Sequence, residues 1–469
     1  MFSSYLIYGL GISGLSLAKY LLENGKKVFL IDDNEKSIIK AKQDLQGFSS
    51  FEFLQFDEIV IKLDKNSVIL FSPGIPLYFP KQHKILNIVK QLHCTLICDI
   101  ELFYLLNKNH KFIAITGTNG KSTVSTLTDF ILHEIGINSC LAGNIGIACF
   151  DLMLNKKISD NTNFVLEISS YQLDLMVDAR FDIAALTNIT SDHIDRYGSF
   201  ENYILAKKKI FRKQDSKQFA VINVDNENSK KVFDELRNDK NFCGNLVPIS
   251  TKKNLENGVS IIDEVLYNNI ANEKFSLQGV ILKGEHNMQN IAMGFACVYL
   301  NLLQNKLLQN DTSQKIIAAI LKFKGLKHRL QFLGNIDGVN FINDSKATNA
   351  ESTQKALEAC DNIFWILGGV AKEGGIKILK PYFSKVIKAY LIGQASEEFA
   401  KILQENSLKF EKCDNLKNAF EKSFFDAKNA GLKESNILLS PACASFDQWK
   451  NFEERGDYFC KKFDEIKKA

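Results

Sequence analysis

The chain has 469 residues, more than one hydrophobic core usually supports, so we expect roughly two to four domains. Its formal net charge of +4, from 58 basic and 54 acidic residues, is too even to indicate a nucleic-acid partner. Hydrophobic residues make up 45% of the chain, yet no stretch approaches the roughly 20 apolar residues of a membrane span, which argues against membrane insertion.

The chain opens with a predicted βαβ unit at residues 6–33. The stretch LIYGLGISGLSLAKYLLENGKKVFLIDD has two short apolar runs around a helical pattern. Gly9, Gly11 and Gly14 have GxGxxG spacing, and Asp32 stands at the end of the second run. This pattern is typical of a dinucleotide-binding turn, where backbone approaches a phosphate at a helix N-terminus. The pattern alone leaves open whose phosphate binds and whether the protein is an oxidoreductase.

Strands and helices alternate almost throughout, which predicts an α/β class with largely parallel sheets. Further strand patterns stand at residues 67–76, 111–116, 163–170, 181–190 and 218–226, and residues 245–283 read as strand-rich and irregular. A helix is expected from about His286 to Leu303. The basic segment KFKGLKHR, residues 322–329, contains Gly325 and is interpreted as a hinge into a domain that repeats the alternation, with a helix from about Glu351 and a final charged helix.

The strongest chemical signal is ITGTNGKST at residues 115–123. An apolar strand runs into Gly117, and Gly120, Lys121, Ser122 and Thr123 open a helix. The glycines let backbone N–H groups face an anion, the lysine adds positive charge, and a hydroxyl can bind Mg²⁺. The general phosphate-loop pattern has a glycine where this chain has Ile115, so the match is to a tighter variant.

Polar side chains follow two of the predicted strands of this region. Glu167 ends FVLEISS, and Asp192, His193 and Asp195 lie in TNITSDHIDRY. Because ligands gather at the carboxyl ends of parallel strands, we expect Glu167 to hold Mg²⁺ and His193 to contact the metal or the substrate.

One lysine lies on an apolar helix face in ENYILAKKKIFRK, residues 201–213. Helical spacing places Tyr203, Ala206, Lys207 and Ile210 on that face, and it points Lys208 and Lys209 elsewhere. Burying a lysine costs free energy unless the charge is paired or neutralised. Spacing alone therefore favours a Lys207 whose amine reaches solvent.

The ten cysteines are scattered, and only Cys94 and Cys98 stand close, as CxxxC, without a second pair to complete a zinc set. We interpret them as buried or incidental thiols of a reducing compartment. The sequence also lacks a signal-peptide pattern, so a cytoplasmic protein is expected.

Taken together, these motifs resemble those of the bacterial Mur ligases over nearly the whole chain. The matching segments are GLGISG, SPGIP, DIELF, TGTNGKST, GNIG, EISSYQL, TNITSDHIDRY, GEHNMQN, HRLQ, NDSKATN and SPACASFDQWKNFEERG. Within that family, NDSKATN together with SPACASFDQ is typical of the member that adds D-glutamate. The resemblance implies addition of D-glutamate to UDP-N-acetylmuramoyl-L-alanine with ATP, through an acyl phosphate, in peptidoglycan precursor synthesis.

The resemblance also implies three domains. A Rossmann-like domain at 1–96 would bind the UDP part of the substrate, and a central P-loop ATPase-type domain at 97–324 would bind ATP. A C-terminal Rossmann-like domain at 325–469 would bind the amino acid and close over the others near Gly325. A monomer with two Mg²⁺ ions is expected.

The site residues carried over by the resemblance fall into four groups. The ATP group is Gly117, Thr118, Asn119, Gly120, Lys121, Ser122, Thr123, Asn287, Asn290, Arg329 and Asp344. The UDP-substrate group is Ile12, Ser13, Asp32, Gly74, Asn144, Ser169, Gln172 and His193. The D-glutamate group is Lys346, Thr348, Lys372, Ser445, Phe446 and Phe452. The metal group is Ser122, Glu167, His193 and Lys207, with Lys207 carbamylated; Lys121, Glu167, His193 and Lys207 are the catalytic set.

The chain departs from the family pattern at two places. Around Lys372 it reads GGVAKEGG, where an acid commonly stands before the lysine or shortly after the next residue. Beside Asp32 it has Asp33 and Asn34, where many relatives have basic or hydroxyl residues.

Three other functions are compatible with parts of the sequence. A ligase of the folylpolyglutamate or cyanophycin type belongs to the same class. A NAD-dependent dehydrogenase would use residues 6–33, and a binding module would use its ATP site as a switch. The complete phosphate loop and its metal candidates argue against the last two.

Overall fold

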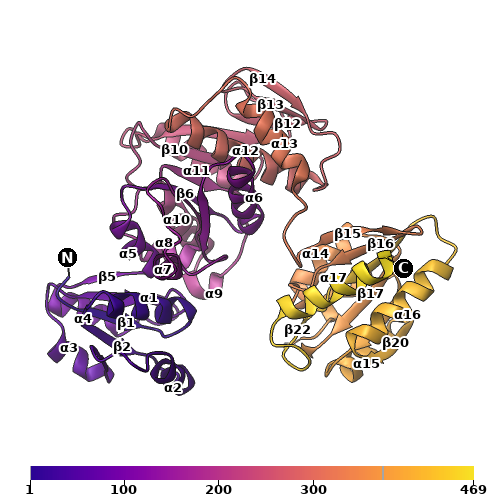
Figure 1. Ribbon diagram of the computed structural model, residues 1–469, viewed down its shortest axis with the longest axis horizontal. Coiled ribbons are helices and arrows are strands. Elements are labelled where there is room, and N and C mark those ends of the chain that lie inside the picture. The colour runs from indigo at the N-terminus through magenta and orange to yellow at the C-terminus, as the bar shows by residue number, and fades with distance from the viewer. Residues whose placement is uncertain (1, 372–373, 469) are drawn as a thin grey trace. The chain divides into compact units, whose positions relative to one another are not determined.

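The computed structural model describes residues 2–371 and 374–468 and divides into two compact units, Met1–Phe323 and Lys324–Ala469 (Figure 1). The division falls inside the basic segment 322–329 that was interpreted as a hinge. Within the first unit, two sheets follow one another along the chain. The domain boundary expected near residue 96 stays a prediction.

The first sheet is parallel throughout, in the order β3-β2-β1-β4-β5. Its strands are β1 Tyr5–Tyr8, β2 Val28–Ile31, β3 Phe51–Phe53, β4 Val68–Phe71 and β5 Thr95–Ile97. The helical segments are α1 Ile12–Glu23, α2 Glu35–Asp44, η1 Phe56–Glu58, α3 Ile59–Lys62, α4 Ile85–Leu92 and α5 Asp99–Leu106. Strands β1, β2 and β4 are wholly buried, as continuous apolar runs in parallel sheets are. The βαβ unit predicted at 6–33 is confirmed.

The second sheet has nine strands in the order β14-β13-β12-β11-β10-β9-β6-β8-β7. They are β6 Lys111–Thr116, β7 Ser139–Gly143, β8 Asn163–Glu167, β9 Ile183–Leu186, β10 Phe219–Asn223, β11 Asn245–Ser250, β12 Val259–Ile262, β13 Val265–Asn268 and β14 Glu273–Ser276. The sheet is parallel from β7 to β12, and β13 and β14 add an antiparallel edge. This edge accounts for the strand-rich, irregular stretch at 245–283.

Alternating side chains of β6 enter two different cores. Phe112 and Ala114 belong to a core that continues into the first sheet, whereas Ile113 and Ile115 belong to the core under α12. Successive residues of a strand point to opposite faces, so one strand serves both layers. Because one core runs through both sheets, residues 1–323 form one compact unit.

The helices of this second layer are α6 Lys121–Glu134, α7 Cys149–Leu154, α8 Ser170–Asp174, α9 Ile194–Tyr197, α10 Phe200–Lys208, η2 Lys209–Phe211, α11 Glu227–Asn238, α12 Glu285–Gln304 and α13 Thr312–Lys322. Helix α12 is buried along most of its length and packs on α6 and the sheet. A helix that is apolar nearly all round belongs in a core, and the predicted helix at 286–303 is confirmed.

The second unit has a six-stranded sheet in the order β15-β16-β21-β17-β19-β20, with only β15 antiparallel, and a two-stranded ribbon of β18 and β22. The strands are β15 Gln331–Ile336, β16 Val339–Asn343, β17 Ile363–Gly368, β18 Val370–Ala371, β19 Val386–Ile392, β20 Phe410–Asp414, β21 Ser435–Leu439 and β22 Cys443–Ala444. The helical segments are α14 Ala350–Ala359, η3 Lys377–Lys385, α15 Ser396–Glu405, α16 Leu416–Asn429 and α17 Phe452–Lys468. The expected α/β alternation is confirmed.

None of the helices in the described part of the chain has the length and apolar character needed to cross a bilayer.

Candidate active site

The phosphate loop joins the end of β6 to the start of α6 at Lys121. Gly117 and Gly120 both have positive φ, at 148° and 86°. A Cβ at Gly117 would overlap the hydroxyl of Thr187, and one at Gly120 would overlap the amide oxygen of Asn290. The loop therefore requires glycine at both positions. It leads into the N-terminus of α6, and the backbone N–H groups of Thr118 and Asn119 donate to Asn188 at 2.8 Å and 2.9 Å.

Two lysine ammonium groups converge on one carbonyl oxygen of this loop. Lys121 Nζ donates to the carbonyls of Gly117 and Thr118, each at 2.9 Å, and Lys207 Nζ donates to the same Gly117 oxygen at 2.7 Å. Lys207 is 1% exposed, so the expectation that its amine reaches solvent is wrong. Burial, followed by the charge of Lys121, holds the pKa of Lys207 well below its usual range.

The helix face predicted around Lys207 is confirmed. Its four members are all buried: Tyr203, Ala206, Lys207 and Ile210. Lys208 and Lys209 point away and pair with Glu235 at 2.6 Å and Asp174 at 2.5 Å. The α-helix ends at Lys208, and the short 3-10 turn η2 follows it. The α-helix is therefore shorter than the segment 201–213 in which it was expected.

Glu167 ends β8 beside the phosphate loop and is buried. Its Oε1 accepts a hydrogen bond from Asn144 Nδ2 at 2.8 Å, whereas its buried Oε2 has no hydrogen-bond partner among the described residues. The buried hydroxyl of Thr116 on the neighbouring strand also lacks one. A carboxylate oxygen without a partner in such a place fits a bound cation.

The described residues contain no group of three or more His, Cys, Asp and Glu side chains that could hold a metal by themselves. Mg²⁺ is commonly bound through one or two carboxylates together with phosphate oxygens and water. Glu167 and the buried hydroxyl of Ser122 fit that partial set.

His193 lies next to the same loop, in the left-handed conformation just before α9. Its ring centroid is 5.0 Å from that of Tyr171 and 5.9 Å from that of Tyr203. Burial lowers the pKa of His193, and Lys207 lowers it further, while Asp192 opposes the shift. The imidazole is therefore neutral near pH 7 and can act as a metal ligand.

The first turn of α12 borders the phosphate loop. Asn290 approaches Gly120, and its Nδ2 lies 3.5 Å from Asn287 Oδ1. Thus Asn290 lies at the loop, and Asn287, which was also predicted from GEHNMQN, lies beside Asn290.

The glycine turn of the first sheet is held by Asp32. Its carboxylate accepts hydrogen bonds from the backbone N–H groups of Leu10 at 2.6 Å and Asn34 at 2.8 Å. Ile12 and Ser13 follow at the start of α1 and are exposed. Asp32 therefore has a structural role in the turn, and α1 presents an accessible N-terminus.

Arg196, which the sequence analysis did not single out, ties the two sheets together. Its guanidinium donates to the carbonyls of Pro73, Gly74 and Ile75 at 2.6–3.0 Å and lies 4.3 Å from the ring centroid of Tyr171. The predicted substrate residue Gly74 is thus held through its backbone carbonyl by the Arg196 side chain. Arg196 belongs to the short helix α9, and nothing in its local sequence indicates this role.

Ser169 and Gln172 form a capping box at the start of α8, in which each side chain bonds to the other residue's backbone N–H. Both were predicted as substrate residues, and the box gives them a structural role as well.

In the second unit, Asp344 lies buried at the end of β16. It accepts hydrogen bonds from Ser440 Oγ at 2.7 Å and from the backbone N–H of Leu330 at 3.1 Å. Burial raises the pKa of Asp344 to about 7. The folded protein therefore holds a proton on Asp344 that the unfolded chain releases near pH 4.

We expect Asp344→Asn to change the pH dependence of stability. The raised folded-state pKa favours folding below about pH 4, and this contribution is lost as pH rises toward 7. Relative to wild type, the variant should gain stability between pH 5 and pH 8, by at most about 3 kcal/mol for the roughly two pKa units between pH 5 and about 7. Thermal unfolding at the two pH values measures this. The exposed Asp464→Asn is the matched control, and a constant difference between Asp344→Asn and wild type would contradict the prediction.

A buried arginine joins three segments of the second unit. Arg455 is 1% exposed, and it donates to Ser345 Oγ at 3.0 Å, to the Ser345 carbonyl at 2.9 Å and to the Cys443 carbonyl at 3.2 Å. Ser345 Oγ in turn donates to the Phe452 carbonyl at 2.8 Å. Burial lowers the pKa of Arg455 to about 10, so it stays a cation. Arg455 belongs to a helix with many charged residues, so the sequence alone does not distinguish it from neighbours whose side chains reach solvent.

The predicted amino-acid residues lie close to these three segments. Lys346 Nζ lies 5.7 Å from the ring centroid of Phe452, and the Thr348 N–H donates to the Lys346 carbonyl at 2.8 Å. Ser445 is buried, and Phe446 is exposed. Lys372 lies outside the described residues.

Arg329 also belongs to the second unit, where its charge acts on Asp344. The predicted ATP residues are therefore divided between the two units.

Comparison with known proteins accounts for this combination of a phosphate loop with two further α/β sheets. The chain matches the Mur ligase MurD-like N-terminal domain at residues 3–92, the Mur ligase middle domain at 115–298 and the Mur ligase glutamate ligase domain at 328–443. It is 42% identical to a UDP-N-acetylmuramoylalanine–D-glutamate ligase of Rickettsia prowazekii over 455 residues, which cover 97% of this chain and 96% of the relative.

A ligase of the same name from Wolbachia pipientis is 37% identical over 508 residues, covering 98% of this chain and 96% of the relative. Among solved structures, a UDP-N-acetylmuramate-alanine ligase, MurC, from Thermotoga maritima has the same fold with a TM-score of 0.55, 14% identity and 99% coverage of both chains. Fold and phosphate loop together define an α/β nucleotide-binding protein of several domains. The chain belongs to the Mur ligase family.

Proposed function

We propose that this protein is an ATP-dependent ligase that joins D-glutamate to UDP-N-acetylmuramoyl-L-alanine, releasing ADP and phosphate. Near-full-length identity of 42% to a relative named for this reaction carries the proposal. The phosphate loop beside Glu167 supports it, since that carboxylate keeps one buried oxygen for a cation. The dehydrogenase alternative has only the opening glycine turn in its favour.

The domains of the proposal are 1–96 for the UDP substrate, 97–324 for ATP and 325–469 for the amino acid. The enzyme acts as a monomer in the cytoplasm, on small-molecule substrates. The division at Phe323 and the separate sheets of the first unit support this organisation.

The ATP phosphates lie against the loop from Gly117 to Thr123, with Lys121 turned from the loop carbonyls toward them. Asn287, Asn290, Arg329 and Asp344 bind the remainder of the nucleotide. The UDP diphosphate lies at the start of α1 on Ile12 and Ser13, and Asp32 contacts uridine. The remaining residues proposed for the sugar and alanyl chain are Gly74, Asn144, Ser169, Gln172 and His193.

The D-glutamate carboxylates are bound by Lys346, Thr348 and Lys372 on one side and by Ser445, Phe446 and Phe452 on the other. Lys346 and the buried Arg455 provide the positive charge that a dicarboxylate requires.

Two Mg²⁺ ions complete the proposed site, held by Ser122, Glu167, His193 and a carbamylated Lys207. When bound, Mg²⁺ offsets the charge of the transferring phosphoryl group. The unpartnered Glu167 oxygen, the neutral His193 and the depressed pKa of Lys207 suit these roles.

The reaction needs no protein nucleophile, because the alanyl carboxylate is one. Its oxygen attacks the γ-phosphorus of ATP, the bond to ADP breaks, and an acyl phosphate forms. The D-glutamate amine then attacks the acyl carbon, loses a proton and expels phosphate. Lys121 and the loop N–H groups position the phosphates, so catalysis is chiefly orientation and electrostatics.

A phosphate-release assay tests the proposal. With UDP-N-acetylmuramoyl-L-alanine and ATP present, D-glutamate should release phosphate at least a hundredfold faster than L-glutamate. Mass spectrometry should detect the amide product. Equal rates with both isomers, or no product with D-glutamate, would reject the assigned substrate.

We expect Arg455→Met to raise the KM for D-glutamate by tenfold or more. The change removes the link between the segments that hold Lys346, Ser445 and Phe452, and it leaves the first unit intact. The KM values for ATP and the UDP substrate should move by less than threefold. Arg455→Lys should recover part of the loss, and an equal rise of all three KM values would indicate general misfolding instead.

A further inference from the structure

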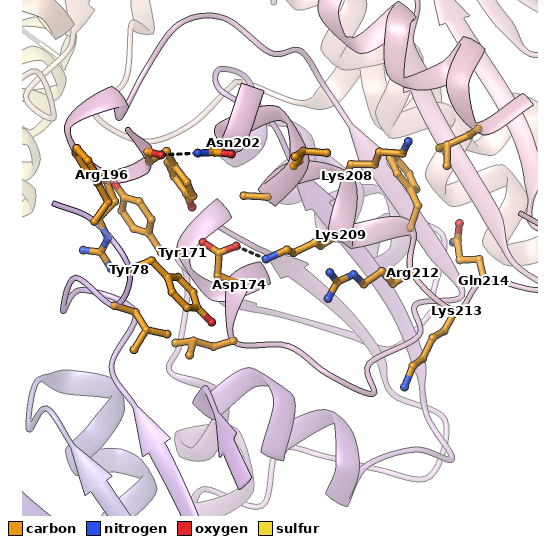
Figure 2. A pocket seen from close by; sticks show the side chains of 18 of the residues that line it. Tyr78, Tyr171, Asp174, Arg196, Asn202, Lys208, Lys209, Arg212, Lys213 and Gln214 are labelled. Atoms are coloured by element: carbon orange, nitrogen blue, oxygen red, sulfur yellow. Dashed lines mark hydrogen bonds and ion pairs between the residues drawn. The ribbon is translucent and has the colours of Figure 1, made fainter. Parts of the chain in front are cut away.

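A cavity of about 760 Å³ lies in the first unit, beside α10 (Figure 2). Leu205 and Lys209 of this helical segment line it. Helical spacing places both nearly opposite Lys207, whose amine reaches Gly117. The rest of the lining comes from the loop after β4, from α8 and α9, and from residues after α11. Its volume is that of ordinary small-molecule sites, roughly 300–1,000 Å³.

The lining is rich in cations, and they differ in their partners within the fold. Lys209 pairs with Asp174, and Lys213 pairs with Asp178, each at 2.5 Å. Among the residues that the structure describes, the guanidinium of Arg212 has neither an ion pair nor a hydrogen bond, and only its backbone N–H donates, to the Lys209 carbonyl at 3.1 Å. Figure 2 shows its guanidinium extending beside Lys209 into the space above Lys213. A planar, unpaired guanidinium at a cavity wall fits a phosphate, sulfonate or carboxylate.

One buried polar atom of the lining also lacks a partner within the described chain, namely Gln214 Oε1. Gln214 is 5% exposed, and its Nε2 already donates to the carbonyls of Phe181 and Phe219. Buried polar groups without partners are uncommon and costly. A ligand with a hydrogen-bond donor would satisfy the amide oxygen of Gln214.

The remaining wall is apolar and aromatic. Tyr78 and Tyr171 contribute aromatic rings, and Leu175, Leu205 and Phe242 contribute apolar surface. Such a wall favours a ligand with a flat apolar body beside its charge.

We propose that this cavity is a second small-molecule site, which takes an organic anion with a planar apolar group and one phosphate, sulfonate or carboxylate. Arg212 binds the anion, and Gln214 accepts a hydrogen bond from the ligand. Because Leu205 and Lys209 lie nearly opposite Lys207, whose amine reaches the phosphate loop, this ligand binds together with the nucleotides. The inference is independent of which amino acid the enzyme adds.

The probe is 8-anilinonaphthalene-1-sulfonate, whose fluorescence rises on binding, titrated into the full chain with saturating ADP and UDP. We expect one saturable site in wild type. In Arg212→Glu/Lys213→Glu, the Kd should rise at least tenfold. In Lys65→Glu/Lys108→Glu, which changes the net charge equally at exposed positions outside the cavity, it should stay within twofold.

Leu205→Trp provides a second test without a change of charge. The side chain is exposed at the cavity wall, so a larger ring should occupy the space without disturbing the core, and the Kd should again rise tenfold. The neutral analogue N-phenyl-1-naphthylamine should bind wild type at least tenfold more weakly. Unchanged probe affinity in either cavity variant, displacement of the probe by ADP or UDP, or equal binding of the neutral analogue would overturn the proposal.

Discussion

Replacement of Lys121 by alanine should lower kcat by about a thousandfold, which corresponds to about 4 kcal/mol of lost transition-state stabilisation. Lys121 opens α6 and already holds two carbonyls of the loop, so its ammonium stands where ATP phosphates would lie. The UDP substrate is assigned to the start of α1, in the other sheet of the first unit. Its affinity, measured by calorimetric titration without ATP, should therefore stay within threefold of wild type.

Lys111→Ala is the matched control, because Lys111 begins β6 at the end opposite the loop and pairs with Asp182 at 3.2 Å. This variant should keep kcat within twofold. A loss of more than tenfold in UDP-substrate affinity in Lys121→Ala would mean that the two sites are not separate.

The fold was predictable where local signals and long-range packing agree. Parallel strands buried on both faces appear as continuous apolar runs, so β1, β6 and β8 could be recognised from sequence. In the edge strands β13 and β14, partly exposed residues alternate with buried residues in β13 and with exposed residues in β14. Each strand has only four residues, which is too few to show a clear hydrophobic period in the sequence. Likewise, no local pattern shows that the first two sheets share one core, because that depends on which face of β6 meets which layer.

The candidate site was predictable where backbone geometry demands particular residues, as at Gly117 and Gly120. It was not predictable where a side chain acts through distant carbonyls. Arg196 and Arg455 hold loops far from them in sequence, and both look like ordinary surface charges in the sequence. The prediction that the Lys207 amine reaches solvent was also wrong. Residue spacing shows which side chains share a helix face, but it does not show how deeply that face is buried.

The burial of Lys207 has a chemical consequence. Burial and the charge of Lys121 lower the pKa of Lys207, so its neutral amine forms at a lower pH than that of an ordinary lysine. A neutral amine can add CO₂: the nitrogen–carbon bond forms, one proton leaves, and a carbamate anion results. Glu167 and Asp192 act electrostatically on the same position, and a cation bound among these groups would offset the new negative charge. As pH falls, the amine is protonated and CO₂ is lost, so the carbamate should disappear on the acid side.

We expect Lys207→Ala to lower kcat by a hundredfold or more, because the site loses the two oxygen ligands of the carbamate. Carbon NMR after exchange with labelled bicarbonate should show a carbamate signal in wild type that is absent in the variant and declines as pH is lowered. Lys208→Ala and Lys209→Ala are the matched controls, since their ammonium groups pair with Glu235 and Asp174 away from the loop. Both should keep the signal and activity within twofold. A signal that persists in Lys207→Ala, or full activity of that variant, would show that the carbamate assignment is wrong.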